Sequence, residues 1–151
     1  MGTGWEQLHC PYFHDACLRV LEDYFRSEGF SRHHADRIGG VVFEGEGHFV
    51  EVSYEAETYP RYSPTLIIGL GSDAYGKALQ VTGVPFWFLI PSTSESSKYI
   101  FWKFGTEAEL LAVLNRIKDE IIQPFGRPLW TDVEALKKMV HRFKVEHVGS
   151  S

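Results

Sequence analysis

The chain has 151 residues, and its 44% hydrophobic and 23% charged residues are ordinary for one folded domain. Its net charge of −5 argues against non-specific binding to nucleic acid, which needs an excess of Lys and Arg. Aromatic residues make up 15% of the chain, more than a core of this size easily hides, so we expect some of them at a binding surface.

The first element predicted by the sequence is a helix from Pro11 to Glu28. Proline suits the first helical position, and Gly29 is a natural stop. Apolar residues recur between them at spacings of three and four, which gives the helix one apolar face. These residues are Phe13, Cys17, Val20, Leu21, Tyr24 and Phe25.

The middle of the chain predicts strands. Val41–Glu44 and His48–Glu55 flank a Gly-Glu-Gly turn, which indicates a hairpin, and Thr65–Leu70 is a further strand. Phe86–Ile90 is a continuous apolar run, which we interpret as a central strand covered on both faces. Tyr99–Phe104 predicts one more aromatic strand.

Two helices are predicted to close the chain, each opened by a capping box, Thr106 with Glu109 and Thr131 with Glu134. Pro124 is expected to end the first of them. Strands grouped in the middle and helices at the ends indicate an α+β fold. We expect a single domain over 1–151, with a mainly antiparallel sheet of about five strands, all helices on one face and flexible ends at 1–8 and 145–151.

A glycine-rich loop is the one stretch that approaches a named chemistry. Gly71-Ser-Asp-Ala-Tyr-Gly-Lys77 falls one residue short of a phosphate-binding P-loop, because Ala78 stands where a hydroxyl would hold Mg²⁺. The Pro85 break also leaves little room for the helix that a P-loop opens. We therefore expect no nucleotide cofactor, and keep Gly69–Lys77, with nearby histidines, only as the basis of an alternative enzymatic or ligand-binding function.

Cys10, His14 and Cys17 are the residues closest to a metal site. Their spacing matches neither of the usual structural zinc pairs, Cys-x₂₋₄-Cys or His-x₃₋₅-His. Cys17 also falls within the apolar stripe of the first helix, where a free cysteine acts as a small hydrophobic residue. We therefore expect no metal, and no catalytic residues can be assigned.

Acidic residues gather in the hairpin region. Between Val41 and Pro60 there are five glutamates and no Lys or Arg, and Phe49 shares a strand face with two of them. One interpretation is a solvated strand face; another is an acidic, aromatic docking surface for a basic protein. The residues of that surface would be Glu44, Glu46, Phe49, Glu51, Glu55 and Glu57.

The layout resembles a group of protein families. A helix ends in Ser27-Glu28-Gly29-Phe30, a hairpin occupies Gly40–Val52, and a late helix, Leu110–Phe125, carries Arg116, Asp119, Glu120 and Pro124. Over roughly residues 12–125 this resembles small bacterial α+β families that include immunity proteins of polymorphic or contact-dependent toxin systems. The resemblance implies a non-catalytic inhibitor that binds one cognate toxin, for which a basic toxin domain would suit the acidic surface.

A third hypothesis is a structural or regulatory subunit that forms a homodimer through a bare sheet face. The N-terminus lacks a basic-then-apolar signal, no apolar stretch is long enough to span a bilayer, and there are only two cysteines. We therefore expect a cytoplasmic protein with no membrane or nucleic-acid partner.

Overall fold

A computed structural model of the chain describes residues 9–36, 38–71 and 83–148. One five-stranded antiparallel sheet forms its centre, with the strands in sequence order. The bounds are β1 Arg32–Ala35, β2 Val41–Glu44, β3 His48–Glu55, β4 Ser63–Leu70 and β5 Gly83–Pro85. The expected α+β fold with a mainly antiparallel sheet is confirmed.

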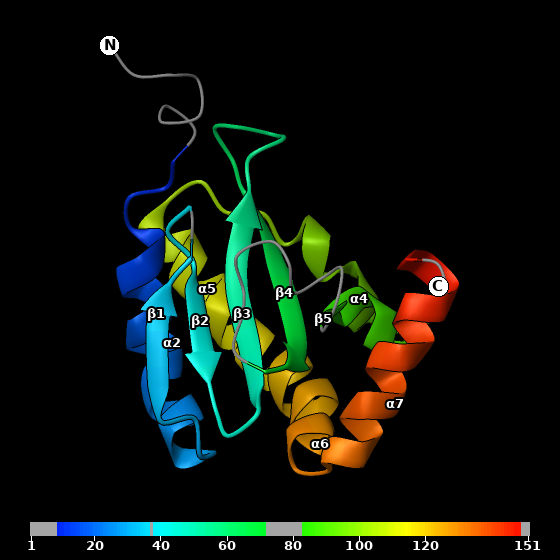
Figure 1. Ribbon diagram of the computed structural model, residues 1–151. Helices are drawn as coiled ribbons and strands as arrows, with labels where there is room; N and C mark the ends of the chain where they lie inside the picture. The colour runs from blue at the N-terminus through cyan, green and yellow to red at the C-terminus, as the bar shows by residue number, and fades with distance from the viewer. Residues whose placement is uncertain (1–8, 37, 72–82, 149–151) are drawn as a thin grey trace.

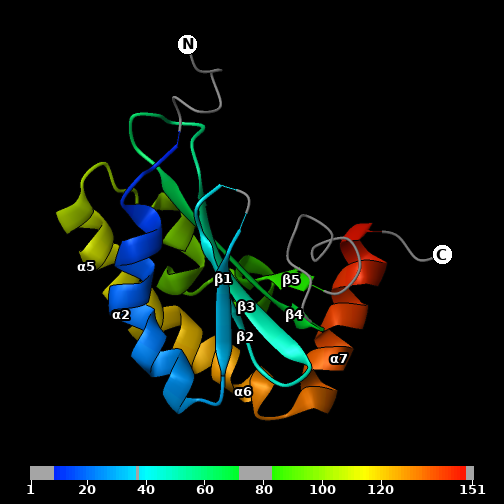
Figure 2. The same cartoon turned by 60° about the vertical axis from the view of Figure 1, so that its left-hand side comes forward.

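The helices lie against one face of this sheet (Figures 1 and 2). Helix α2 packs against α5, and α7 lies at the β4–β5 end of the sheet. Their bounds are α2 Phe13–Ser27, α4 Phe86–Leu89, α5 Glu107–Ile117, α6 Arg127–Trp130 and α7 Val133–Phe143. Among the described residues, no helix has the length and apolar character needed to cross a membrane.

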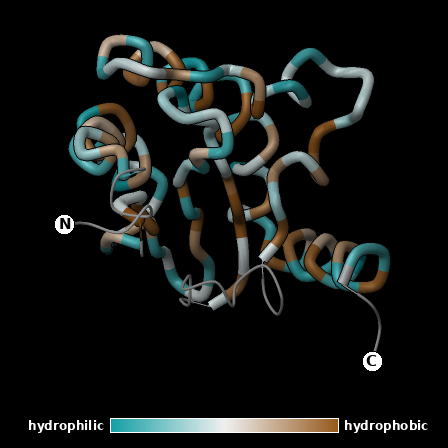
Figure 3. Tube along the Cα trace, turned by 90° about the horizontal axis from the view of Figure 1, so that it is seen from above, coloured by the Kyte–Doolittle hydropathy of each residue, from teal (hydrophilic) through white to brown (hydrophobic). Residues whose placement is uncertain are grey.

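The core lies between the helices and the sheet. The apolar stripe of α2 packs against α5 and meets Phe43 of β2 and Tyr54 of β3. The alternate residues Val50 and Val52 of β3 belong to the same core. Brown, apolar stretches therefore run along the central strands in Figure 3. The opposite sheet face carries a smaller apolar group, Val42 and Phe49 with Ile67 packed against them.

Two segments differ from the predicted strands. Phe86–Leu89 is the short helix α4, because an apolar run without periodicity does not distinguish a strand from a buried helical turn. Glu95–Phe101 is a 3₁₀ helix, η1, opened by Ser94, whose Oγ accepts a hydrogen bond from the Ser96 N–H. Only Phe104 of the predicted Tyr99–Phe104 strand pairs, in a single bridge with Tyr62.

The C-terminal helices also differ from expectation. Pro124 does not end the first of them: α5 runs on through the π-helical segment η2, Lys118–Gly126, which contains Pro124. Asp132 rather than Thr131 caps α7, accepting from the Ala135 N–H at 3.3 Å. The helical segment η3, Lys144–Val148, occupies part of the expected flexible end; residues 1–8 and 149–151 lie outside the described residues.

The cap of α5 gives a direct test of local stability. Thr106 Oγ1 accepts from the Glu109 N–H at 3.1 Å, and Glu109 Oε1 accepts from the Gly105 N–H at 2.8 Å. Thr106→Ala should lower the free energy of unfolding by about 1 kcal/mol, because it leaves a helical N–H without its acceptor. Urea midpoints would measure this. Thr131→Ala removes no N-cap, only the hydrogen bond that Thr131 Oγ1 donates to the Arg127 carbonyl oxygen at 2.8 Å, and should change the midpoint less. Equal losses would contradict the assigned role of Thr106.

Candidate functional site

The acidic residues of the hairpin region do not form one surface. Glu44 is only 7% exposed, and its carboxylate lies 3.5 Å from Arg32 and 3.7 Å from His34. Glu46 is exposed in the turn before β3, whereas Glu55 is exposed at the far end of that strand. An eight-residue strand spans about 25 Å, so the exposed carboxylates at its two ends cannot meet one partner group.

Phe49 and Glu51 do not contribute to an exposed acidic, aromatic patch. Phe49 is fully buried, at 0% exposure, in the small apolar group on the second sheet face. Burial, with a smaller contribution from the neighbouring Asp36, raises the pKa of Glu51 to about 8. Glu51 is therefore largely uncharged at pH 7. Sequence reasoning missed both points because a charge count does not show which carboxyl groups are buried.

The three residues considered as zinc ligands are packed in or beside the core. Cys10 and Cys17 are buried free thiols within the main core. Burial raises the pKa of Cys17 well above its ordinary value, which opposes formation of the thiolate that zinc requires. His14 is half-buried, with Nδ1 3.5 Å from the Gly40 carbonyl oxygen. Across 9–36, 38–71 and 83–148, no three His, Cys, Asp or Glu side chains are grouped to hold a metal ion.

Three large apolar side chains are exposed on α4 and η1. Trp87 is 46% exposed, Ile100 40% and Phe101 67%. Between them Tyr99 is buried and its hydroxyl hydrogen-bonds the main chain of Trp87, which fixes η1 beside α4. We call Trp87, Ile100 and Phe101 the α4–η1 surface.

Two neighbours define the borders of the α4–η1 surface. The Trp87 ring lies 5.9 Å from Phe143, the last residue of α7, and 5.4 Å from His147 of η3, between centroids, so this end of the chain supports it from one side. On another side, the Glu55 carboxylate lies close enough to Tyr99 to oppose ionisation of its phenol, a smaller influence than burial. Glu55, expected as part of a docking surface, thus lies near the buried Tyr99 of η1.

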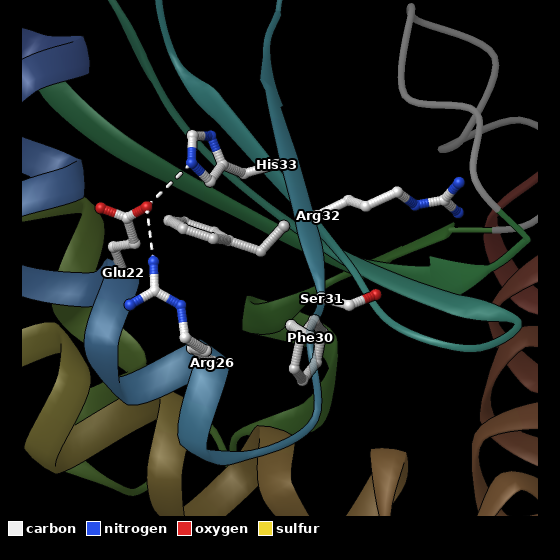
Figure 4. A pocket seen from close by; sticks show the side chains of 7 residues that line it. Glu22, Arg26, Phe30, Ser31, Arg32 and His33 are labelled. Carbon is white, nitrogen blue, oxygen red and sulfur yellow. Dashed lines mark hydrogen bonds and ion pairs between the residues drawn. The ribbon is translucent and has the colours of Figure 1, made fainter.

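A pocket of about 330 Å³ opens at the other end of the sheet, between α2 and the edge strand β1 (Figure 4). Glu22 Oε2 lies 3.0 Å from both Arg26 and His33, so these three side chains of the pocket are engaged with one another. Ser31 points away from His33, so the two do not form a nucleophile and base. The pocket residues are Glu22, Arg26, Phe30, Ser31, Arg32, His33 and Phe43.

Most of the glycine-rich loop Gly69–Lys77 lies outside the described residues, which leave out 72–82. Gly69 is the penultimate residue of β4, and Gly71 follows with φ +83°, a conformation that suits glycine. The aromatic excess in the composition was the one sequence signal for the α4–η1 surface, but it did not say which rings would be exposed.

Comparison of the chain with protein-family models, curated proteins and solved structures finds no match.

Proposed function

We propose that this protein is a non-catalytic binding module, an immunity-type inhibitor that neutralises a cognate toxin by docking on it through the α4–η1 surface. The observation that carries the proposal is the exposure of two large rings, Phe101 at 67% on η1 and Trp87 at 46% on α4, two elements joined by the hydrogen bond between the Tyr99 hydroxyl and the Trp87 main chain. Large rings left in water lose the free energy that burial would give them, about 1.5–3 kcal/mol for a fully buried Phe. A partner that covers them recovers this free energy, and aromatic residues are enriched at such interfaces.

The negative charge of exposed glutamates near the α4–η1 surface indicates a basic partner. Glu55 and Glu57 are both exposed, and Tyr59, 51% exposed, follows them in the same loop. The segment from Val41 to Pro60 contains no Lys or Arg. A basic protein surface would be attracted to this side of the apolar surface and would bind fastest at low salt. The basic toxin domain suggested by the resemblance fits this description.

Removing the two exposed rings tests the docking surface. The double substitution Trp87→Ser, Phe101→Ser should weaken binding to a toxin domain encoded beside the gene by at least about 100-fold, since central aromatic side chains carry most interface free energy. Titration calorimetry would measure the affinity. Val133→Ser is the matched control, because Val133 is 41% exposed but lies at the start of α7.

Equal binding by the parent and the double variant would exclude the α4–η1 surface. A concentration-dependent dimer that the double variant loses would assign the surface to a second copy of the chain, which is the homodimer hypothesis. Sedimentation of the free protein separates these results.

The acidic border is tested by association rates. Glu55→Gln should slow association with the same toxin domain at low salt and reduce the salt dependence, because a charge that attracts the partner is removed. Glu46→Gln removes an equal charge at the other end of β3 and should leave the rate almost unchanged. Stopped-flow fluorescence would measure both. Equal effects of the two substitutions would show that net charge alone, rather than a local border, steers the partner.

A further inference from the structure

β1 is one edge of the sheet, and half of its main-chain polar groups face outward. Among the described strands, only β2 pairs with β1. The Asp36 N–H donates to the Gly40 carbonyl oxygen at 3.1 Å, so this pair of residues is hydrogen-bonded. Bonded and non-bonded pairs alternate along an antiparallel ladder, which makes the preceding pair, Ala35 with Val41, non-bonded. By the same alternation, the N–H and C=O groups of His33 and Ala35 point away from β2.

The two edges of the sheet differ in how open they are to a further strand. At the other edge, β5 has three residues, ends in Pro85, which has no N–H to donate, and packs beside α4 and α7. β1 contains no proline, and its pairing with β2 runs without a bulge. All but one of its residues are exposed. An exposed edge with outward N–H and C=O groups is a template for an added strand.

The pocket beside α2 opens along this edge. His33 shares a sheet face with its cross-strand partner Phe43, and its ring points toward α2, where Nε2 lies 3.0 Å from Glu22 (Figure 4). Phe43 and Phe30, both buried, give the pocket an apolar side. In a strand laid along β1, the residue opposite His33 would have its side chain on this same face, over the pocket.

The opposite face of β1 presents an exposed cation. Arg32 is paired with Glu44 across β1 and β2, and its guanidinium lies 3.5 Å from that carboxylate. The Arg32 side chain is nevertheless 69% exposed, whereas that of Glu44 is 9% exposed. In Figure 4 Arg32 points away from His33, as adjacent residues of a strand do. Because β1 contains no carboxylate, a residue of an added strand opposite Arg32 would meet this cation.

On the side of α2, the charged groups are already paired with one another. Glu22 Oε2 lies 3.0 Å from both Arg26 and His33. The Asp23 side chain, which is 97% exposed, lies 3.3 Å from the same Arg26 guanidinium. This side therefore selects an added residue by the apolar lining of the pocket rather than by charge. The two faces together favour a strand that is apolar toward α2 and acidic toward Arg32.

We propose that the β1 edge, defined by the outward main-chain groups of His33 and Ala35, is a docking site for an extended segment of a partner protein in which apolar and acidic residues alternate. The segment adds as one further strand, pairing with these main-chain groups. Its apolar side chain opposite His33 covers the pocket, and its carboxylate opposite Arg32 pairs with the guanidinium.

A second copy of the chain fits the β1 edge less well, because β1 itself offers only alanine as an apolar side chain for the pocket. The β1 edge lies apart from the α4–η1 surface, whose elements contact β4 and β5. Binding at one of the two does not require binding at the other.

Peptide binding tests the β1 edge. A short fluorescein-labelled peptide of alternating valine and glutamate should bind the full chain, and the same peptide with lysine in place of glutamate should bind at least about fivefold more weakly, the scale of a cross-strand charge pair. Alanine in place of valine should weaken binding about tenfold, because less apolar area is buried over the pocket. Fluorescence polarisation would measure all three affinities.

Two substitutions separate main-chain pairing from charge. Ala35→Pro removes an outward N–H without removing a bond to β2, and should weaken binding of the valine–glutamate peptide about tenfold. Arg32→Gln should weaken it about two- to fivefold and abolish its advantage over the lysine peptide. Arg61→Gln is the matched control, because Arg61 is 55% exposed, lies 3.9 Å from a carboxylate and precedes β4; it should bind as the parent does.

Hydrogen exchange of the parent needs no variant to fold. Saturation with the valine–glutamate peptide should raise the protection factors of the His33 and Ala35 N–H groups at least about tenfold and leave those of α7 unchanged. Unchanged protection of β1, equal binding of the lysine peptide, or no binding at about 1 mM peptide would each overturn the proposal. A concentration-dependent dimer of the free chain that Ala35→Pro abolishes would overturn it as well, by assigning the β1 edge to a second copy.

Discussion

Phe25→Ala should lower the free energy of unfolding by about 3–5 kcal/mol, the usual cost of removing a fully buried Phe. The Phe25 ring is stacked on Phe43 of β2, with centroids 4.4 Å apart, and meets Phe30 at 4.8 Å and Trp130 at 5.8 Å. The substitution would therefore leave a cavity where α2, the sheet and α6 meet. Guanidinium denaturation would measure the loss.

Tyr24→Phe is the control for that substitution. The Tyr24 hydroxyl is buried and finds no hydrogen-bond partner within the described ranges, so its removal should be neutral or slightly stabilising. A loss under 1 kcal/mol for Phe25→Ala would mean that α2 does not pack on β2 as described.

Leu114→Ala should cost about 2–5 kcal/mol, because Leu114 is fully buried on the face of α5 that packs against α2. The exposed residue Asn115 follows it on the same helix, and Asn115→Ala should change the free energy of unfolding by less than about 0.5 kcal/mol. Denaturant midpoints for both variants give the comparison. Similar midpoints for the two would show that this face of α5 is not part of the core.

The elements that sequence reasoning predicted well are those whose signal is local. The three- and four-residue spacing of Phe13, Cys17, Leu21 and Phe25 predicted α2, and the Gly-Glu-Gly turn predicted the β2–β3 hairpin at its observed bounds. The side-chain cap at Thr106 was likewise predicted from its spacing to Glu109. Each signal depends only on residues within a few positions of one another.

The elements that were missed depend on tertiary contacts. β1 has only four residues, without apolar alternation, and is a strand because it pairs with β2. Phe86–Leu89 is helical because Phe86 turns into the core, where it packs closely against Gly126. These contacts join residues that are far apart in the chain, so no local pattern reports them.

The candidate site was likewise predicted only where its signal is local in the sequence. The sequence predicted that rings would be exposed and that the hairpin region would be acidic, but not that Phe49 is buried or that Arg32 neutralises Glu44. Sequence spacing also placed Glu51 among the charged residues, whereas its burial beside Asp36 keeps it largely uncharged at pH 7. Which acidic residue faces a partner is decided by packing across strands.

The proposed function is tested most directly by protection of living cells. The toxin-like domain encoded beside the gene would be expressed alone, with the parent, with the Trp87→Ser, Phe101→Ser variant and with Val133→Ser, and colony-forming units would be counted. We predict that the parent and Val133→Ser restore growth, and that the double variant does not although it accumulates in folded form. Equal protection by the double variant, or no protection by the parent, would contradict a toxin inhibitor that acts through the α4–η1 surface.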